Sequence, residues 1–455
     1  MSAPTQDVVE QDVVETVLRH ADAGLERSRE NLFALLRIPS ISAQPEHTDD
    51  CVRAAEWVRG ELAGLGFEAS LRLTQGHPVV LAHHPAPDGY RGPHILFYAH
   101  YDVQPIDPVE LWSSPPFEPR LVDGPRGPRF VARGAVDDKG QMLMFIEALR
   151  AWTTATGGIP AKVTVLVEGE EEVGSLNLEP FLRANRAELA ADLALISDTG
   201  MWDIDTPALT TRLRGLAYVE LIVRAANRDL HSGLFGGSAL NPVNALTRVL
   251  GELQDADGRI RVPGFYDDVT EPSGRLAAEW AALGFDERAF LGDVGLSEPA
   301  GERGRPALER LWARPTADVN GIWGGYAGAG AKTVIAAEAG AKVSFRLVPH
   351  QDPAKVVEGF RRFVAERLPA DARAEVRVLS SGPAIEVPGE QALMQAAQAA
   401  LAEEFGRPAV MVGSGGSIPV VSSLKSVLGI DSLLMGFSLD DDQVHSPNEK
   451  FEQRC

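Results

Sequence analysis

The pattern of apolar and polar residues along the chain predicts helices first, and then strands that alternate with helices. Apolar positions recur at helical spacing over residues 8–36 and stop before Pro39, which indicates one or two amphipathic helices; another helical pattern follows over residues 51–67. The next apolar runs are strand-like and are separated by helical stretches: VVLAHH, HILFYAHYD, a helix over residues 140–152, VTVLVEGEEE and ADLALISD. This alternation predicts an α/β domain with a mixed, largely parallel sheet flanked by helices.

A second type of domain begins near Thr206, where the pattern changes. The stretches LAYVELIVRAA and AKVSFRLVPH have the two-residue period of strands, and NPVNALTRVLGELQ between them has helical spacing. Residues 255–315 are rich in proline, glycine and charge, so we expect surface helices and loops there. Beyond residues 383–388 a helical pattern returns. We therefore expect an α/β domain formed by residues 1–206 and 386–455, interrupted by an inserted α+β domain of residues 207–385.

Length and charge narrow the class of protein. A chain of 455 residues exceeds what one hydrophobic core normally organises, and 44% hydrophobic with 24% charged residues is an ordinary globular composition. The net charge of −21, without a basic stripe, argues against nucleic acid as a partner. No run approaches the ~18 apolar residues of a membrane span, the N-terminus has no signal-peptide pattern, and the two cysteines, Cys51 and Cys455, lie far apart. We expect a cytoplasmic protein that does not bind membranes.

Potential metal ligands follow three of the strand-like runs. HILFYA is followed by His100 and Asp102, VTVLVEG by the acidic triplet 170–172, and ADLALIS by Asp198. The carboxyl ends of parallel strands share one edge of an open α/β sheet. These side chains are therefore expected to converge.

Two further segments carry candidates: Asp137 and Asp138 precede a helix in RGAVDDKGQ, and His445 lies in DDDQVHSPNEK. Taken singly, an HxD pair is more often a surface or capping feature than a metal site. A glutamate triplet is usually a solvated helix start, and a histidine before Ser-Pro is usually a loop residue. Acids that follow long apolar runs are harder to explain in this way, because burial of an unpaired carboxylate is costly. The joint occurrence favours two ions that share a carboxylate, and imidazole and carboxylate donors suit zinc, manganese or cobalt.

A series of short motifs resembles one known family along nearly the whole chain. In order they are LLRIPSIS, YAHYDVQP, GAVDDKG, EGEEEVGS, ISD, HSG, GGSIP and HSPNE. The series is similar to that of the co-catalytic zinc metallopeptidases, peptidase family M-twenty, which includes carnosinases, aminoacylases and succinyl-diaminopimelate desuccinylases. The resemblance implies a catalytic domain with an inserted lid or dimerisation domain.

The resemblance also implies a set of metal ligands. Asp137 would bridge two divalent ions, zinc being the first choice and manganese or cobalt the alternatives. His100 and Asp198 would complete one metal site, and Glu172 and His445 the other. The bond between Asp137 and the next residue is commonly a cis peptide in this family.

The catalytic roles follow from the same resemblance. Glu171 looks like the general base, and Asp102 would orient the imidazole of His100. The implied reaction is attack on an amide carbonyl by a hydroxide that bridges the two ions. Glu171 would take the proton from the water molecule and return it to the leaving amine.

The insert would contribute to catalysis and to substrate binding. His231 in DLHSGLFGG resembles the histidine that stabilises the oxyanion in the active site of the other subunit, which implies a homodimer through the insert; the alternative is a histidine that caps a turn. Arg346 resembles the residue that binds the substrate carboxylate, although it could also be an ordinary strand arginine. Supporting substrate contacts would come from four further residues: Thr333, Asn320, Gly416 and Ser417.

Asp198 favours dipeptides among the substrates of the family. Deacylase branches commonly carry glutamate at the matching position, whereas dipeptidase and tripeptidase branches carry aspartate. The passage IWGGYAGAGAKTVI also looks like the carnosinase branch. The prediction is a dipeptidase of broad range. The alternatives are an amidohydrolase acting on N-acyl amino acids and a metal-free binding module, against which the full ligand set argues.

The sequence departs from the family after HSPNEK. The family usually continues into a closing helix, whereas this chain stops at FEQRC. We expect an altered or shortened end, with Cys455 as a tail residue rather than a functional thiol.

Overall fold

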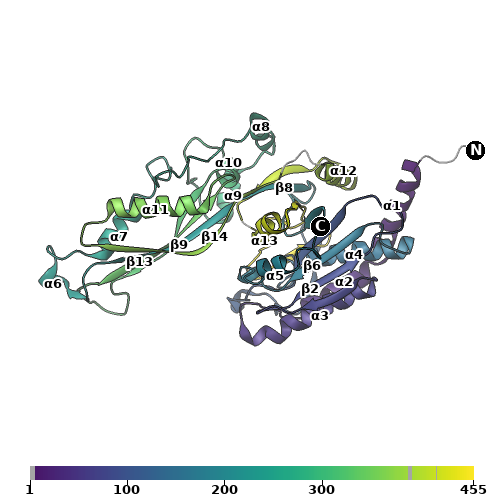
Figure 1. Ribbon diagram of the computed structural model, residues 1–455, viewed down its shortest axis with the longest axis horizontal. Coiled ribbons are helices and arrows are strands. Elements are labelled where there is room, and N and C mark those ends of the chain that lie inside the picture. The colour runs from purple at the N-terminus through teal and green to yellow at the C-terminus, as the bar shows by residue number, and fades with distance from the viewer. Residues whose placement is uncertain (1–5, 388–391, 417) are drawn as a thin grey trace, which may run out of the picture. The chain divides into compact units, whose positions relative to one another are not determined.

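The chain folds into two compact units, which the computed structural model describes over residues 6–387, 392–416 and 418–455 (Figure 1). The first unit consists of Met1–Thr210, Val387–Met411 and Pro419–Cys455, and the second of Thr211–Glu386 and Val412–Ile418. Each unit has a buried apolar cluster of its own. Among the helices described, none has both the length and the apolar character needed to cross a membrane.

The first unit is built on a mixed sheet whose central strands are parallel. The order across the sheet is β1 (Glu68–Arg72), β2 (Val79–His84), β6 (Lys162–Glu168), β3 (His94–His100), β7 (Leu193–Ile196), β17 (Asp431–Leu434), β8 (Ala208–Leu213) and β15 (Ile385–Glu386), and β16 (Val410–Ser414) pairs with β8. β6, β3, β7 and β17 run parallel, whereas β1, β2, β8 and β15 join antiparallel. The mixed, largely parallel sheet expected from the sequence is confirmed.

Helices of the first unit pack against this sheet or against one another. They are α1 (Gln6–Ala23), α2 (Leu25–Leu36), α3 (Thr48–Gly64), α4 (Lys139–Thr156), α5 (Leu178–Ala184), α12 (Ala392–Phe405) and α13 (Pro419–Ser423). Single 3-10 turns form η1 (Pro45–His47), η2 (Val109–Leu111) and η3 (Glu171–Val173), and η4 (Leu424–Leu428) is a π-helical segment. The expected N-terminal helical region is two helices separated at Gly24. Apolar residues of α2, α3 and α4, such as Leu35, Val58 and Ile146, form one core with Phe97 and Val165 of the sheet.

A small sheet brings the C-terminal segment beside the loop that precedes α4. Its strands are β4 (Arg120–Gly124), β5 (Gly127–Val131) and β18 (Lys450–Glu452). Phe451 of β18 pairs with Phe130 of β5. Residues just after His445 therefore lie next to residues just before Asp137.

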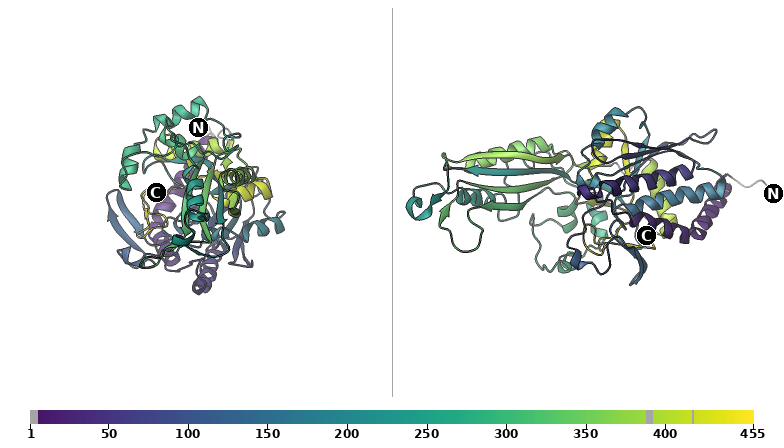
Figure 2. Two further views of the ribbon diagram at one scale, coloured as in Figure 1. Left: turned by 90° about the vertical axis from the view of Figure 1, so that its left-hand side faces the viewer. Right: turned by 90° about the horizontal axis from the view of Figure 1, so that it is seen from below.

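The second unit is an antiparallel sheet with two helices on one face. Its elements are β9 (Gly215–Arg224), β10 (Leu230–His231), α6 (Ser232–Phe235), α7 (Pro242–Gly251), α8 (Gly274–Ala282), α9 (Glu287–Asp293), α10 (Ala307–Trp312), β11 (Thr316–Gly324), β12 (Val334–Ile335), β13 (Glu338–Leu347), α11 (Pro353–Arg367) and β14 (Arg373–Gly382). The sheet order is β11-β13-β9-β14. Alternate residues such as Val219, Leu221 and Val343 are buried under α7 and α11, and in Figure 2 the strands run along α11.

A buried ion pair stabilises the region of α8 to α10, where the sequence predicted surface helices. Arg314 donates to Glu302 from Nε at 2.6 Å and from Nη2 at 3.1 Å, and the two side chains are only 4% and 6% exposed. Burial acts to raise the pKa of Glu302, but hydrogen bonds from Arg314 and Tyr266 outweigh it and lower that pKa below its usual 4.5. The pair therefore stabilises the fold at neutral pH.

Replacement of Glu302 by glutamine is expected to lower the free energy of unfolding at pH 7 by about 3 kcal/mol, because Arg314 loses its buried counter-charge. A carboxylate with a lowered pKa contributes stability above its unfolded pKa, and that contribution is lost as the pH falls through its folded value. The variant should therefore lose less stability than the wild type below about pH 4.5. Urea unfolding between pH 3 and 7 measures both effects, with the exposed Glu298→Gln as control.

Candidate metal centre

Three neighbouring parallel strands deliver their following residues to one edge of the sheet. β3 lies between β6 and β7 and ends at His100. The turn η3, which holds Glu171 and Glu172, follows β6, and Asp198 follows β7. The convergence expected from strand order is therefore present in the fold.

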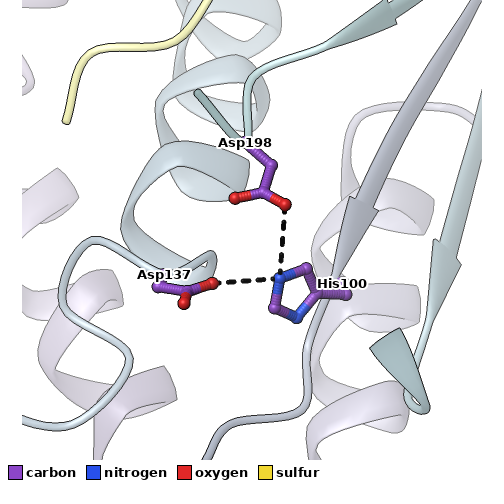
Figure 3. A group of neighbouring side chains, drawn as sticks. All are labelled: His100, Asp137 and Asp198. Carbon is purple, nitrogen blue, oxygen red and sulfur yellow. Dashed lines mark ion pairs between the residues drawn. The ribbon is translucent and has the colours of Figure 1, made fainter. Parts of the chain in front are cut away.

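His100 and two carboxylates form one group of potential ligands (Figure 3). The His100 Nε2 atom lies 3.2 Å from Oδ1 of Asp137 and 3.9 Å from Oδ2 of Asp198. The His100 side chain is fully buried, and its Nε2 makes no well-formed hydrogen bond with the residues described. A buried imidazole nitrogen that faces two acidic oxygens is an arrangement that suits a cation.

A second group adjoins the first and shares Asp137 with it. The His445 Nε2 atom lies 2.9 Å from Oδ2 of Asp137 and 3.2 Å from Oε2 of Glu172. In each group the ligand atoms lie within 4.8 Å of one another. Asp137 thus offers one oxygen to each group, which is how a carboxylate bridges two ions.

The charges around these groups also fit cations. Burial, together with Asp137 and Asp138, raises the pKa of Asp198 well above its usual value. Burial raises the pKa of Asp138 to about 8. Carboxylates packed together away from water repel one another, and divalent ions would relieve that repulsion. Nitrogen and oxygen donors without thiolate fit zinc, manganese or cobalt.

Asp102 contacts the imidazole of His100, as expected, but its carboxylate has a second function. The His100 Nδ1 atom lies 3.1 Å from the backbone oxygen of Asp102 and 3.4 Å from its Oδ1. The carboxylate of Asp102 also accepts hydrogen bonds from the backbone N–H groups of Glu171 and Glu172, at 3.3 and 3.1 Å. Asp102 therefore ties the end of β3 to the turn η3.

Glu171 lies in η3 beside the ligand groups. Burial, opposed by His100 and reinforced by the negative charges of Glu172 and Asp102, raises the pKa of Glu171 to about 7. A carboxylate with a pKa near neutrality suits proton transfer at physiological pH. Glu171 is not among the atoms of the two ligand groups.

The loop before α4 has two local features at Asp137, the residue that the two groups of potential ligands share. The peptide bond between Asp137 and Asp138 is cis, as the resemblance implied. The Oδ2 atom of Asp138 accepts a hydrogen bond from the backbone N–H of His100 at 3.2 Å. Asp138 therefore holds the start of α4 against the end of β3.

Gln104 contacts one of the potential ligands, and the sequence did not single it out. Its Nε2 atom donates to Oε2 of Glu172 at 2.7 Å and to the backbone oxygen of Glu172 at 3.3 Å. This contact orients the oxygen that also faces His445. The signal was present, because Gln104 belongs to the YDVQP motif, but its spacing alone does not indicate its partner.

In the second unit, His231 occupies the N-cap of the short helix α6. Its Nδ1 atom accepts a hydrogen bond from the backbone N–H of Gly233 at 3.0 Å, and the residue is exposed. The turn-capping alternative is therefore realised in the structure. A neutral imidazole that accepts through Nδ1 carries its hydrogen on Nε2. The Nε2 atom of His231 is therefore left as a hydrogen-bond donor.

Arg346 lies on β13 of the second unit near another arginine. Arg214 lies just before β9, and its Nε atom donates to the backbone oxygen of Gly415 at 3.0 Å. Its backbone N–H donates to the backbone oxygen of Gly416 at 3.1 Å. Burial and the charge of Arg346 lower the pKa of Arg214 to about 10. The two arginines and this loop therefore lie close together within the unit.

The other expected substrate contacts are less tightly held. Thr333 is exposed and its backbone oxygen accepts from the N–H of Ser232 at 3.0 Å, which places it beside His231. Asn320 is exposed on β11 at an irregularity in the strand register. Ser417 lies outside the described residues.

Comparisons with known proteins agree along most of the chain. A family model described as peptidase family M20/M25/M40 matches residues 96–455. The Cys-Gly metallodipeptidase of Candida albicans is 30% identical, and the similarity covers 93% of this chain and 90% of that protein. The human Beta-Ala-His dipeptidase is also 30% identical, and the similarity covers 83% of this chain and 74% of that protein.

Solved structures show the same similarity. Human carnosine dipeptidase 1 has a TM-score of 0.80 at 27% identity and covers 96% of this chain and 94% of its own. An M20 family metallo-carboxypeptidase from Sulfolobus solfataricus has a TM-score of 0.82 at 30% identity, covering 93% and 94%. Both similarities extend over the two units.

Proposed function

The chain belongs to peptidase family M20/M25/M40, and on that premise we propose that it hydrolyses the amide bond of dipeptides with two divalent metal ions. The observation that carries the proposal is the pair of ligand groups that share Asp137. The relatives named for dipeptide hydrolysis, of Cys-Gly and of β-Ala-His, are similar over most of this chain. A metal-free binding module has no need of two complete ligand groups.

Five residues would hold the two ions: His100, Asp137 and Asp198 on one side, and Asp137, Glu172 and His445 on the other. Two bound divalent ions would lower the pKa of a shared water molecule and polarise the scissile carbonyl. Zinc is our first assignment, and manganese and cobalt accept the same donors. Metal analysis of protein dialysed after purification tests the number and identity of the ions.

Glu171 acts as the general base in this proposal. It takes a proton from the attacking water molecule and returns that proton to the leaving amine nitrogen, so that the carboxylate is regenerated in each cycle. Asp102 holds both the His100 ring and the turn that carries Glu171. His231 donates from Nε2 to the oxyanion that develops on the former carbonyl oxygen, and in a dimer it would do so in the partner's site.

Substrate orientation depends on the second unit in this proposal. Arg346 would bind the carboxylate at the C-terminal end of the dipeptide, since a guanidinium matches that group in geometry and charge. Thr333, Asn320, Gly416 and Ser417 would provide the remaining contacts. Arg214, which shares its surroundings with Arg346, adds positive charge near the same place.

A panel of substrates tests the proposed reaction against its alternative. Protein loaded with zinc or manganese should release free amino acids from Cys-Gly, β-Ala-His and α-dipeptides, and chelator treatment should abolish the release. N-acyl amino acids should be cleaved much more slowly, because Asp198 is the residue type of the dipeptidase branch. Rapid deacylation without any dipeptide cleavage would replace the proposal with the amidohydrolase alternative.

We also propose a homodimer formed through the second unit. β11 is an edge strand, and its exposed residues include Val319, Ile322 and Trp323, at 45%, 54% and 40% of their surface. An edge strand with exposed apolar side chains is a template for pairing with another chain. A second copy would cover it and would bring His231 to the site that it completes.

Replacement of Ile322 by aspartate is expected to convert the dimer to a monomer and to lower dipeptidase activity with it, because a charge opposes burial at the interface. Size-exclusion chromatography with light scattering measures the mass. Leu379→Asp on the opposite edge strand β14, where Leu379 is 46% exposed, is the matched control and should remain dimeric. A dimeric Ile322→Asp variant would argue for another interface.

Finally, we propose a cytoplasmic location. Cys51 and Cys455 are both free thiols, and burial raises the pKa of the Cys51 thiol to about 12, which keeps it protonated. Cell fractionation tests this assignment.

A further inference from the structure

Glu449 is a fully buried carboxylate in the segment that leads from His445 to β18. Neither the ligand groups nor the proposed mechanism uses it. Glu449 is the acidic residue of the HSPNE motif, and its side chain is buried in the first unit without contact to solvent. A buried acid must be compensated by donors, so its partners indicate its role.

The partners of Glu449 all lie in one short loop, the segment that ends at Asp137. Oε1 accepts from the backbone N–H groups of Val136 and Asp137, at 2.9 and 3.1 Å. Oε2 accepts from the backbone N–H of Gly134 at 2.9 Å and from Nη1 of Arg133 at 2.8 Å. Each carboxylate oxygen thus accepts two hydrogen bonds, and three of the four donors are backbone groups.

These bonds fix the backbone from which Asp137 projects. The N–H of Asp137 itself is one of the donors, and Asp137 supplies an oxygen to each ligand group. Arg133 adds the charge that compensates Glu449, and it is held in turn by the backbone oxygen of Pro105 at 3.0 Å. A rotation of this loop would move the shared oxygen pair of Asp137.

The segment that contains His445 and Glu449 is also held in place by hydrogen bonds. Asn448 accepts from the N–H and the hydroxyl of Ser113, both at 2.7 Å, and donates to the backbone oxygen of Leu111 at 2.8 Å. The backbone oxygen of Glu449 also accepts from Ala132 at 3.2 Å. The position of His445, four residues before Glu449, is therefore linked to that of the loop 132–137.

We propose that Glu449 is a positioning residue, which sets the distance between Asp137 and His445 and so determines how tightly the centre holds its metal ions. The inference rests on the proposed function, because it assigns metal ions to these residues. A role confined to fold stability would require only that the buried charge of Arg133 be matched. The three hydrogen bonds from backbone N–H groups of the loop 132–137 are not needed to match that charge.

The decisive variant is Glu449→Gln, which keeps the size of the side chain. Its amide group must face either the N–H groups of Val136 and Asp137 or those of Gly134 and Arg133, so one pair of donors loses its acceptor and meets another donor. We expect zinc affinity about 10–100-fold weaker than that of the wild type, because the groups that support metal ligands typically contribute that much.

The measurement is zinc titration of metal-free protein in competition with a chromophoric chelator, which does not depend on activity. Glu452→Gln is the matched control, because Glu452 lies three residues further on and is also buried. Its side chain contacts Arg126 and Lys450 rather than the loop 132–137. It should bind zinc like the wild type. Near-ultraviolet circular dichroism of each metal-free variant reports on the fold.

The outcomes separate this inference from the function on which it rests. Glu449→Gln protein that is folded and binds zinc like the wild type overturns the positioning role and leaves the function intact. Wild-type protein that binds no zinc overturns the function. If the single variant does not fold, the double variant Arg133→Gln, Glu449→Gln removes the unmatched charge, while at least one of the three backbone donors still lacks an acceptor. It should show the same weakened affinity, and wild-type affinity in it would contradict the proposal.

Discussion

Replacement of Glu171 by glutamine is expected to lower kcat on dipeptides by about 10²–10⁴-fold, the usual contribution of a general base. Glutamine keeps the shape of the side chain but cannot take the proton of the attacking water molecule. Glu171 is outside both ligand groups, so metal content and KM should change little. Steady-state kinetics on the zinc-loaded variant, together with its metal analysis, measure the effect.

Glu179→Gln is the control for this prediction. Glu179 is a surface residue of α5 that pairs with Arg183 one turn away, and its loss should leave kcat unchanged. A Glu171→Gln enzyme with wild-type kcat would remove Glu171 from the chemistry. A variant that loses its metal ions as well as its activity would instead make Glu171 a ligand.

Replacement of Asp137 by asparagine is expected to affect both metal ions at once. One Asp137 oxygen faces His100 and the other faces His445, whereas an asparagine side chain offers one neutral oxygen and a donor. We expect the variant to retain fewer than two ions. Its kcat/KM should fall by about 10³-fold or more, because several kcal/mol of charge stabilisation is lost.

Metal analysis and kinetics on the same preparation test this second prediction. Asp123→Asn, on an exposed position of β4, changes the charge of the protein equally and should have no effect. Two tightly held ions in the Asp137→Asn protein would show that the bridge is formed by another group.

The candidate site was predictable where local sequence determines it. His100 and Asp198 follow runs of apolar residues that could be recognised as buried strands, and parallel strands place such residues on one edge. Their convergence therefore follows from general rules of α/β sheets. The mixed sheet was predictable for the same reason, since its strands have strong apolar patterns.

Other parts of the site depend on contacts between distant segments, which no local pattern reports. Asp137 meets His445 because β18 pairs with β5, and neither strand is longer than five residues. These two candidate ligands could be assigned through the family resemblance but not through periodicity. Glu449 and Gln104 could not be assigned at all, because the meaning of a buried polar residue depends on the donors and acceptors that surround it.

The position of β17 within the sheet has a consequence for protein synthesis. It pairs with β7 on one side and β8 on the other, yet Asp431 follows Ile196 by more than half of the chain. At ~5–20 residues per second, a ribosome would need roughly 10–50 s to supply it after β7 is complete. During that interval the β7 edge that β17 later covers would stay unpaired, and the nascent chain would lack His445.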